Sequence, residues 1–166
     1  MYLRSPEFLR GGMLRFKIRA GMLYLNDEVG RRSKRDRDRI CSMCDCGVVE
    51  DVKHFLFTCP KLSHVRDMFC DRLKSICEKY NISSLVDVWK GDDVSSRLCI
   101  VLGDCVGLVR EELPGEISPG DATRELRQVT NYFIMFLWSV RRKVLYSDLA
   151  IPMARGANVP LCGSAS

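Results

Sequence analysis

The sequence predicts a mostly α-helical fold, because apolar residues recur at helical spacing in three separate segments. These segments are residues 8–25, 60–80 and 121–146. The connections between them contain residues that favour turns, and residues 111–120 alone hold two prolines and two glycines. The last segment is the longest, so the fold should end in a long C-terminal helix.

The first segment places Leu14, Ile18 and Met22 four residues apart, so they should share one face of a helix. Gly21 is a candidate for the end of this helix. The residues that follow, 26–39, are polar and are expected to form a loop.

The second segment begins at Pro60, which suits the first turn of a helix because its missing N–H is not needed there. The helix should continue to about Tyr80. Its apolar residues lie three or four apart and should form one buried face: Val65, Phe69, Leu73 and Ile76.

The remainder of the chain predicts a short helix over 84–90, an apolar helix over 95–110 and the long helix 121–146. The long helix carries an apolar stripe at alternating spacings of three and four: Leu126, Val129, Phe133, Phe136, Val140 and Val144. We therefore expect a basic helix plus a small Cys-Cys-His-Cys zinc knuckle within 1–80, a helical region at 81–147 and a disordered tail at 148–166.

The charge is unevenly distributed along the chain. Lys and Arg exceed Asp and Glu by 26 to 21, and residues 1–66 hold 14 basic against 8 acidic side chains. A basic surface favours an anionic partner such as nucleic acid, although a solvated positive face would have the same composition. The most concentrated basic residues are Arg31, Arg32, Lys34, Arg35, Arg37 and Arg39.

Nine cysteines is a high count and, because the number is odd, they cannot all pair within the chain. The first ten residues lack the apolar run of a signal peptide. We therefore expect a reducing intracellular compartment, in the nucleus or the cytoplasm. The most apolar stretch, 132–138, is far shorter than the roughly 20 residues that cross a bilayer, so no membrane partner is expected.

Four residues have the spacing of a metal site: Cys41-x2-Cys44-x9-His54-x4-Cys59. Zinc takes four thiolate or imidazole ligands at tetrahedral corners. Because four ligands close the shell and leave no place for water, the predicted ion is one structural Zn²⁺ per chain and not a catalytic one. Two substitutes stay open, since Cys46 could replace Cys44 and His64 lies shortly after Cys59.

The residues around this motif resemble the zinc-knuckle region that follows the polymerase domain in non-LTR (LINE-like) retrotransposon reverse transcriptases. The resemblance spans 14–66, about a third of the chain. The matching features are Arg19 and Gly21, Gly30 and Arg31, Arg39 before Cys41 and Cys44, Val49-Glu50-Asp51 before His54-Phe55-Leu56, and Cys59-Pro60 before Arg66.

This resemblance implies zinc binding and a role in holding RNA or DNA beside a polymerase. The acidic pair that holds catalytic metals in that polymerase has no counterpart here, because the only Asp-Asp, Asp92–Asp93, follows Lys90–Gly91 and reads as a turn. We therefore expect no enzymatic activity from this chain.

Two functions stay open from the sequence. In the first, the basic residues of 31–39 bind nucleic-acid phosphates, for which arginine is well suited. In the second, zinc only stabilises a scaffold whose helix 121–146 binds a protein partner. Phe55, Leu56 and Phe57 lie between two ligands, where they could stack on bases but more often would form a small core against Met68, Phe69 and the first helix.

Overall fold

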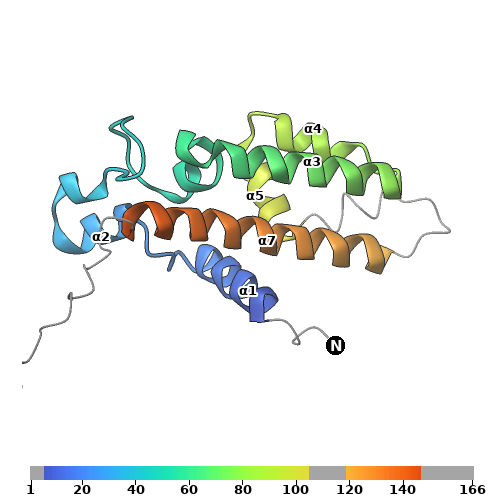
Figure 1. The fold of residues 1–166 in the computed structure, drawn as a ribbon, viewed down its shortest axis with the longest axis horizontal. Coiled ribbons are helices and arrows are strands. Elements are labelled where there is room, and N and C mark those ends of the chain that lie inside the picture. Colours follow the sequence, from blue (N-terminus) through green and yellow to red (C-terminus); the bar gives the residue numbers. More distant parts are fainter. Residues whose placement is uncertain (1–5, 105–118, 147–166) are drawn as a thin grey trace, which may run out of the picture.

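The structure is a computed structural model that describes residues 6–104 and 119–146. It confirms the mostly helical class, and within the described ranges there is no strand beyond a single antiparallel bridge between Ile40 and Val49. The long C-terminal helix α7 (Pro119–Tyr146) forms the axis of the molecule (Figure 1). None of the helices described is both long and apolar enough to cross a membrane.

Helices from both halves of the chain pack around α7. On one side α3 (Ser63–Tyr80) runs antiparallel to it, and on the other side α1 (Pro6–Arg19) crosses it (Figure 1). The shorter helix α4 (Ser84–Lys90) packs on α3 and on α5 (Val94–Leu102), and α5 in turn packs on α7 and α1. The described residues on the two sides of residue 80 share one hydrophobic core, and the expected domain division stays a prediction.

Aromatic rings fill the centre of this core. Phe69 of α3 stacks on Phe133 of α7 with centroids 4.3 Å apart. Trp89 of α4 meets the same two rings edge-on, at 4.6 and 5.6 Å. The expected face of α3 is confirmed, since Val65, Phe69, Leu73 and Ile76 are all buried.

The stripe predicted for α7 is only partly buried. Leu126 and Phe133 are in the core, but Phe136 and Val144 remain 49% and 38% exposed. The reason is that α7 is contacted by α1 and α3 from different sides, so its buried surface is wider than one stripe and includes Ile134 and Leu137.

The first helix is shorter than expected. It ends at Arg19, and Gly21 adopts the left-handed conformation (φ +62°) that glycine reaches without steric cost. Leu14 and Ile18 are buried, whereas Met22 lies beyond the helix and is 59% exposed.

Residues 26–39 are not the expected loop. They form α2 (Asn26–Ser33) and a 3₁₀ turn, η1 (Asp36–Arg39), separated by Lys34 in the left-handed region (φ 55°). Acidic residues in the first turn of α2 pair with arginines one turn later, Asp27 with Arg31 and Glu28 with Arg32. Such pairs stabilise a helix that carries little apolar periodicity.

The other boundaries lie close to those expected. Pro60 begins a 3₁₀ turn, η3 (Pro60–Leu62), that leads into α3. Helix α5 starts at Val94, because Asp93 caps the N–H groups of Ser95 and Ser96. It ends at Leu102, where Gly103 adopts the left-handed conformation (φ +77°), short of the expected end at 110, and residues 105–110 lie outside the described residues. The expected tail 148–166 also lies outside them, as does the expected loop 111–120 apart from Pro119 and Gly120, which begin α7.

Candidate metal centre

The four expected ligands come together in one buried cluster. One ligand atom each from Cys41, Cys44, His54 and Cys59 lies within 4.8 Å of the others. The four side chains are at most 6% exposed. This Cys₃His group could hold a metal ion.

The first pair of ligands, Cys41 and Cys44, belongs to a small hairpin. The Ile40–Val49 bridge is flanked by hydrogen bonds from Cys41 N–H to the Val48 carbonyl and from Glu50 N–H to the Arg39 carbonyl, both 2.8 Å. Within the turn, the backbone N–H groups of Met43 and Cys44 point at the Cys41 sulfur. Backbone donors arranged in this way favour a negatively charged sulfur.

The second pair of ligands lies at the two ends of a single wide helical turn, η2 (His54–Thr58). Its π-type geometry is closed by a hydrogen bond of 2.8 Å from Cys59 N–H to the His54 carbonyl. Asp51 caps the turn, because its Oδ1 accepts the His54 N–H at 2.7 Å. The wide turn thus brings residues five apart in sequence to the same point.

The imidazole of His54 is oriented by its two nitrogens. Nε2 faces the cluster, 3.4 Å from Cys44 Sγ, and Nδ1 lies 3.1 Å from Thr58 Oγ1. A polar partner on the second nitrogen fixes the ring of a metal-binding histidine. Nε2 is therefore the ligand atom that His54 offers.

The ionisation of the cluster reflects its burial. Burial raises the pKa of Cys41 to about 12 and also raises the pKa of Cys59. Burial acts in the same sense on Cys44, but hydrogen bonds from the Cys46 backbone and from neighbouring thiols outweigh it and lower the pKa of Cys44. Burial lowers the pKa of His54, which keeps its imidazole neutral. A neutral imidazole is the form that binds a metal.

The two alternative ligands are outside the cluster. Cys46 is exposed and touches Cys44 through its side chain. His64 is exposed on the first turn of α3. None of the described cysteines forms a disulfide.

Arg66 is a partly buried cation beside the cluster. Its Nη2 donates to the Cys59 carbonyl at 2.7 Å, and burial lowers its pKa although the Cys59 sulfur acts in the opposite sense. Arg39, which precedes the first ligand in the sequence, binds Asp27 and Asp36. The sequence contained a signal for Arg66 only through the family resemblance.

A buried ion pair joins the segment that holds the four candidate ligands, residues 41–59, to α7. Arg141 donates from Nε and Nη2 to both carboxylate oxygens of Glu50, each at 2.7 Å. Asn26 completes the network, since its N–H donates to Glu50 at 2.9 Å and its Oδ1 accepts from Arg141 at 3.2 Å. Sequence reasoning missed this pair, whose partners are far apart in the chain.

The apolar residues between the ligands belong to the core. Phe55, Leu56 and Phe57 are all buried, and Phe55 meets Trp138 of α7 edge-on at 6.1 Å. The prediction that Met68 belongs to this core is wrong, because its side chain is 63% exposed.

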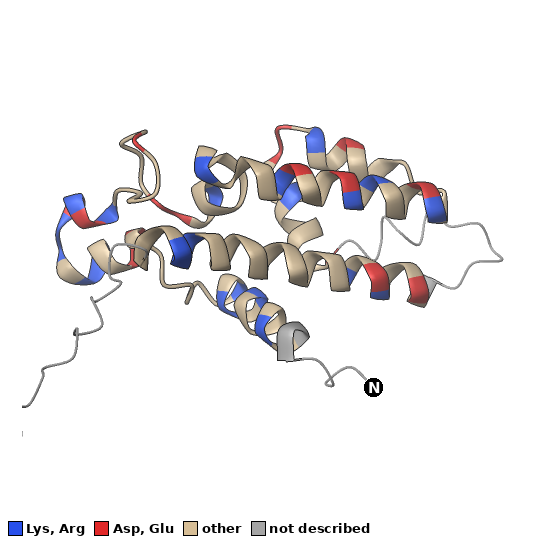
Figure 2. Cartoon of the chain, viewed as in Figure 1, with Lys and Arg blue, Asp and Glu red and all other residues tan. Residues whose placement is uncertain are grey.

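The basic residues of 31–39 divide into two groups. Arg31, Arg32 and Arg39 form ion pairs with nearby acids. Lys34, Arg35 and Arg37 are exposed and form no ion pair with any residue that the structure describes. Figure 2 shows both signs of charge intermixed around α2 and η1.

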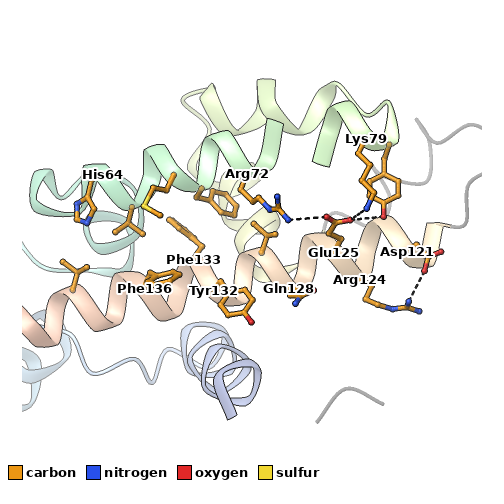
Figure 3. A pocket seen from close by; sticks show the side chains of 16 residues that line it. His64, Arg72, Lys79, Asp121, Arg124, Glu125, Gln128, Tyr132, Phe133 and Phe136 are labelled. Atoms are coloured by element: carbon orange, nitrogen blue, oxygen red, sulfur yellow. Dashed lines mark hydrogen bonds and ion pairs between the residues drawn. The ribbon is translucent and has the colours of Figure 1, made fainter. Parts of the chain in front are cut away.

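Figure 3 shows a groove between α3 and α7, with a volume of about 950 Å³. The exposed Met68 and Phe136 lie along it. At one end of the groove the charged side chains pair with one another. There Glu125 accepts hydrogen bonds from Lys79 at 2.6 Å and from Tyr80 at 3.0 Å.

The fold and the cluster define this chain as a mostly helical protein with a buried Cys₃His cluster that could hold a metal ion. Comparison with family models, with curated proteins and with solved structures finds no match.

Proposed function

We propose that the chain is a zinc-stabilised, nucleic-acid-binding module of the kind found after the polymerase domain of non-LTR retrotransposon reverse transcriptases. The observation that carries the proposal is the buried Cys₃His cluster, with its ligand atoms within 4.8 Å of one another. Three thiolates and an imidazole are donors that select zinc. Zinc bonds of about 2.0–2.3 Å at tetrahedral angles separate ligand atoms by about 3.5–3.8 Å, close to the 3.4 Å between Cys44 Sγ and His54 Nε2.

In this proposal the zinc ion is structural. It joins the hairpin of Cys41 and Cys44 to the turn of His54 and Cys59, and so fixes the segment that precedes α3. Because three thiolates outweigh one dication, the filled site carries a net charge of about −1, which Arg66 is placed to offset. Thiolate ligands have to stay reduced, so an intracellular compartment is part of the proposal.

The metal assignment is tested by native mass spectrometry of the purified chain. One zinc ion per wild-type chain is expected, and its loss in His54→Ala. The matched control is His64→Ala, which changes the only other histidine, an exposed one, and should keep the metal. A wild-type chain without metal, after purification under reducing conditions with zinc supplied, contradicts the assignment.

Nucleic-acid binding is supported by the exposed cations Lys34, Arg35 and Arg37 next to the metal segment. Contacts from such side chains go to phosphates and do not read sequence. The expected result of Arg35→Glu with Arg37→Glu is weaker binding to RNA or DNA, measured by fluorescence anisotropy. Unchanged binding would remove this surface from the proposal.

A second candidate is favoured by the groove between α3 and α7. Met68 and Phe136 leave apolar surface exposed there, and exposed apolar patches often bind proteins. In that case zinc stabilises a scaffold and the chain has no affinity for nucleic acid. The same anisotropy measurement on the wild-type chain separates the two candidates.

A further inference from the structure

A second groove lies between α1 and the C-terminal end of α7 and has a volume of about 770 Å³. Its lining includes four cations, Arg10 and Lys17 from α1 and Arg142 and Lys143 from α7, and no acidic residue. All four side chains are exposed. Figure 2 marks the Lys and Arg positions in blue on the ribbons of α1 and of the last turns of α7.

These cations differ from those of the first groove. There, Arg72 and Lys79 pair with Glu125, and Arg124 pairs with Asp121. By contrast, Arg10, Lys17, Arg142 and Lys143 form no ion pair within the described part of the chain. Four unneutralised cations around one concave surface produce a positive potential that attracts an anion.

The lining of the second groove also includes apolar and aromatic side chains. Trp138 and Tyr146 of α7 line it together with Met13 of α1, and Tyr146 and Met13 are 55% and 59% exposed. Aromatic rings between cations are the combination that binds single-stranded nucleic acid, because bases stack on the rings while phosphates contact the cations. A duplex keeps its bases stacked and cannot use the rings in this way.

The groove is built from rigid elements. Arg141 anchors the last turns of α7 to Glu50, and the next two residues, Arg142 and Lys143, line the groove. At Gly11, α1 approaches α7 so closely that a Cβ would lie 2.6 Å from the Asn131 carbonyl oxygen. These contacts hold α1 and α7, which form the two walls of the groove, at a fixed distance from each other.

We propose that the groove between α1 and α7 binds a single-stranded nucleic-acid segment, with Arg10, Lys17, Arg142 and Lys143 on its phosphates and Trp138 and Tyr146 stacked on its bases. This proposal rests on the proposed nucleic-acid function and adds where and in which form the strand binds. It adds strand contacts along α1 and the last turns of α7 to those proposed for residues 31–39.

The test is the fluorescence anisotropy of labelled 12-nucleotide RNA and DNA single strands of the same sequence, titrated with the full chain at several salt concentrations. Each lost phosphate contact lowers the slope of log affinity against log salt by about 0.7 for a single strand. Lys17→Gln with Arg142→Gln should therefore lower the slope by about 1.4 and the affinity at 0.1 M salt about 25-fold. Tyr146→Leu should cost about tenfold with an unchanged slope.

The matched control is Lys90→Gln with Arg127→Gln, which removes the same charge from exposed residues that line neither groove. It should leave the affinity within about twofold, because distant exposed charges are largely screened. A preference for RNA over DNA, or the reverse, identifies which single strand is held.

The possible failures are distinguishable. If the wild-type chain binds and only Arg35→Glu with Arg37→Glu weakens binding, the groove proposal is overturned while the proposed function stands. If duplex DNA or a polyglutamate peptide binds as tightly as the single strands, the groove is not a single-strand site. A wild-type chain that binds no nucleic acid overturns both proposals.

Discussion

Arg141 and Glu50 form a two-pronged ion pair, with Nε and Nη2 each 2.7 Å from a carboxylate oxygen. The Arg141 and Glu50 side chains are 7% and 1% exposed. Glu50 lies between Cys44 and His54 of the Cys₃His cluster and Arg141 lies on α7, so this contact joins the segment of the cluster to the long helix. The guanidinium also lies 5.2 Å from the Trp138 ring, over its face.

Arg141→Met should destabilise the fold strongly. The substitution leaves the Glu50 carboxylate buried without its cation, which typically costs about 3–5 kcal/mol. Urea unfolding followed by circular dichroism measures this change in the free energy of unfolding.

The double variant Glu50→Gln with Arg141→Met provides the control. It removes both charges, so its loss of stability should be smaller than that of Arg141→Met alone. If Arg141→Met costs less than about 1 kcal/mol, the pair does not hold the two parts together.

Two adjacent glycines of α1 should respond in opposite directions to alanine. At Gly11 an added Cβ meets the Asn131 carbonyl oxygen at 2.6 Å, so Gly11→Ala must push α1 away from α7. Gly12 has no atom within 4 Å of such a Cβ, so Gly12→Ala should stabilise the helix by about 0.5–1 kcal/mol.

Thermal unfolding of the two variants checks this pair. Gly11→Ala should lower the melting temperature and Gly12→Ala should raise it slightly. Equal effects of the two substitutions would contradict the close crossing of α1 and α7.

Much of the helical fold was predictable because it depends on local spacing. The buried face of α3, from Val65 to Ile76, follows from residues three and four apart. The metal cluster was predictable for the same reason, since a turn brings Cys41 and Cys44 together and another brings His54 to Cys59.

The rest of the structure depends on contacts that the spacing of residues along the sequence does not indicate. The partners Glu50 and Arg141 are 91 residues apart. Helix α2 escaped prediction because charge pairs and not apolar periodicity support it. Phe136 fits the spacing of the apolar stripe of α7, yet its side chain is exposed. The spacing of apolar residues does not indicate on which sides other elements pack against a helix.

Cys44 and Cys46 should differ in their importance for the metal. Cys44 is 6% exposed and within the cluster, whereas Cys46 is exposed and outside it. Cys44→Ser should release the metal or weaken its binding, because a hydroxyl is a much poorer zinc ligand than a thiolate. Competition with a chromogenic chelator measures the affinity.

Cys46→Ser is the matched control, two residues away, and should keep one tightly bound ion. The reverse result, with metal retained by Cys44→Ser and lost by Cys46→Ser, would move the ligand assignment to Cys46. Equal retention by both variants would indicate that either thiol completes the site.

The stability contributed by Glu125 should depend on pH. Its hydrogen bond from Lys79 lowers the pKa of Glu125 below its ordinary value of 4.5, against the opposing effect of burial and with help from Tyr80. A carboxyl group whose pKa is lower in the folded state stabilises the fold above the unfolded pKa and loses that effect as the pH falls through the folded pKa. Because the Glu125 side chain is 23% exposed and thus partly screened, Glu125→Gln should cost only about 0.5–1 kcal/mol at pH 7.

The cost of the same substitution should shrink as the pH falls from 7 toward 3, because Glu125 becomes protonated as the pH passes through its folded pKa. Urea unfolding of the wild type and the variant at each pH gives this difference, and any metal lost at low pH is lost from both proteins. Glu78→Gln, an exposed change of the same charge on α3, should shift stability by less than about 0.5 kcal/mol at pH 7. A cost of Glu125→Gln that stays constant between pH 7 and pH 3 would show that its carboxylate charge does not stabilise the contact between α3 and α7.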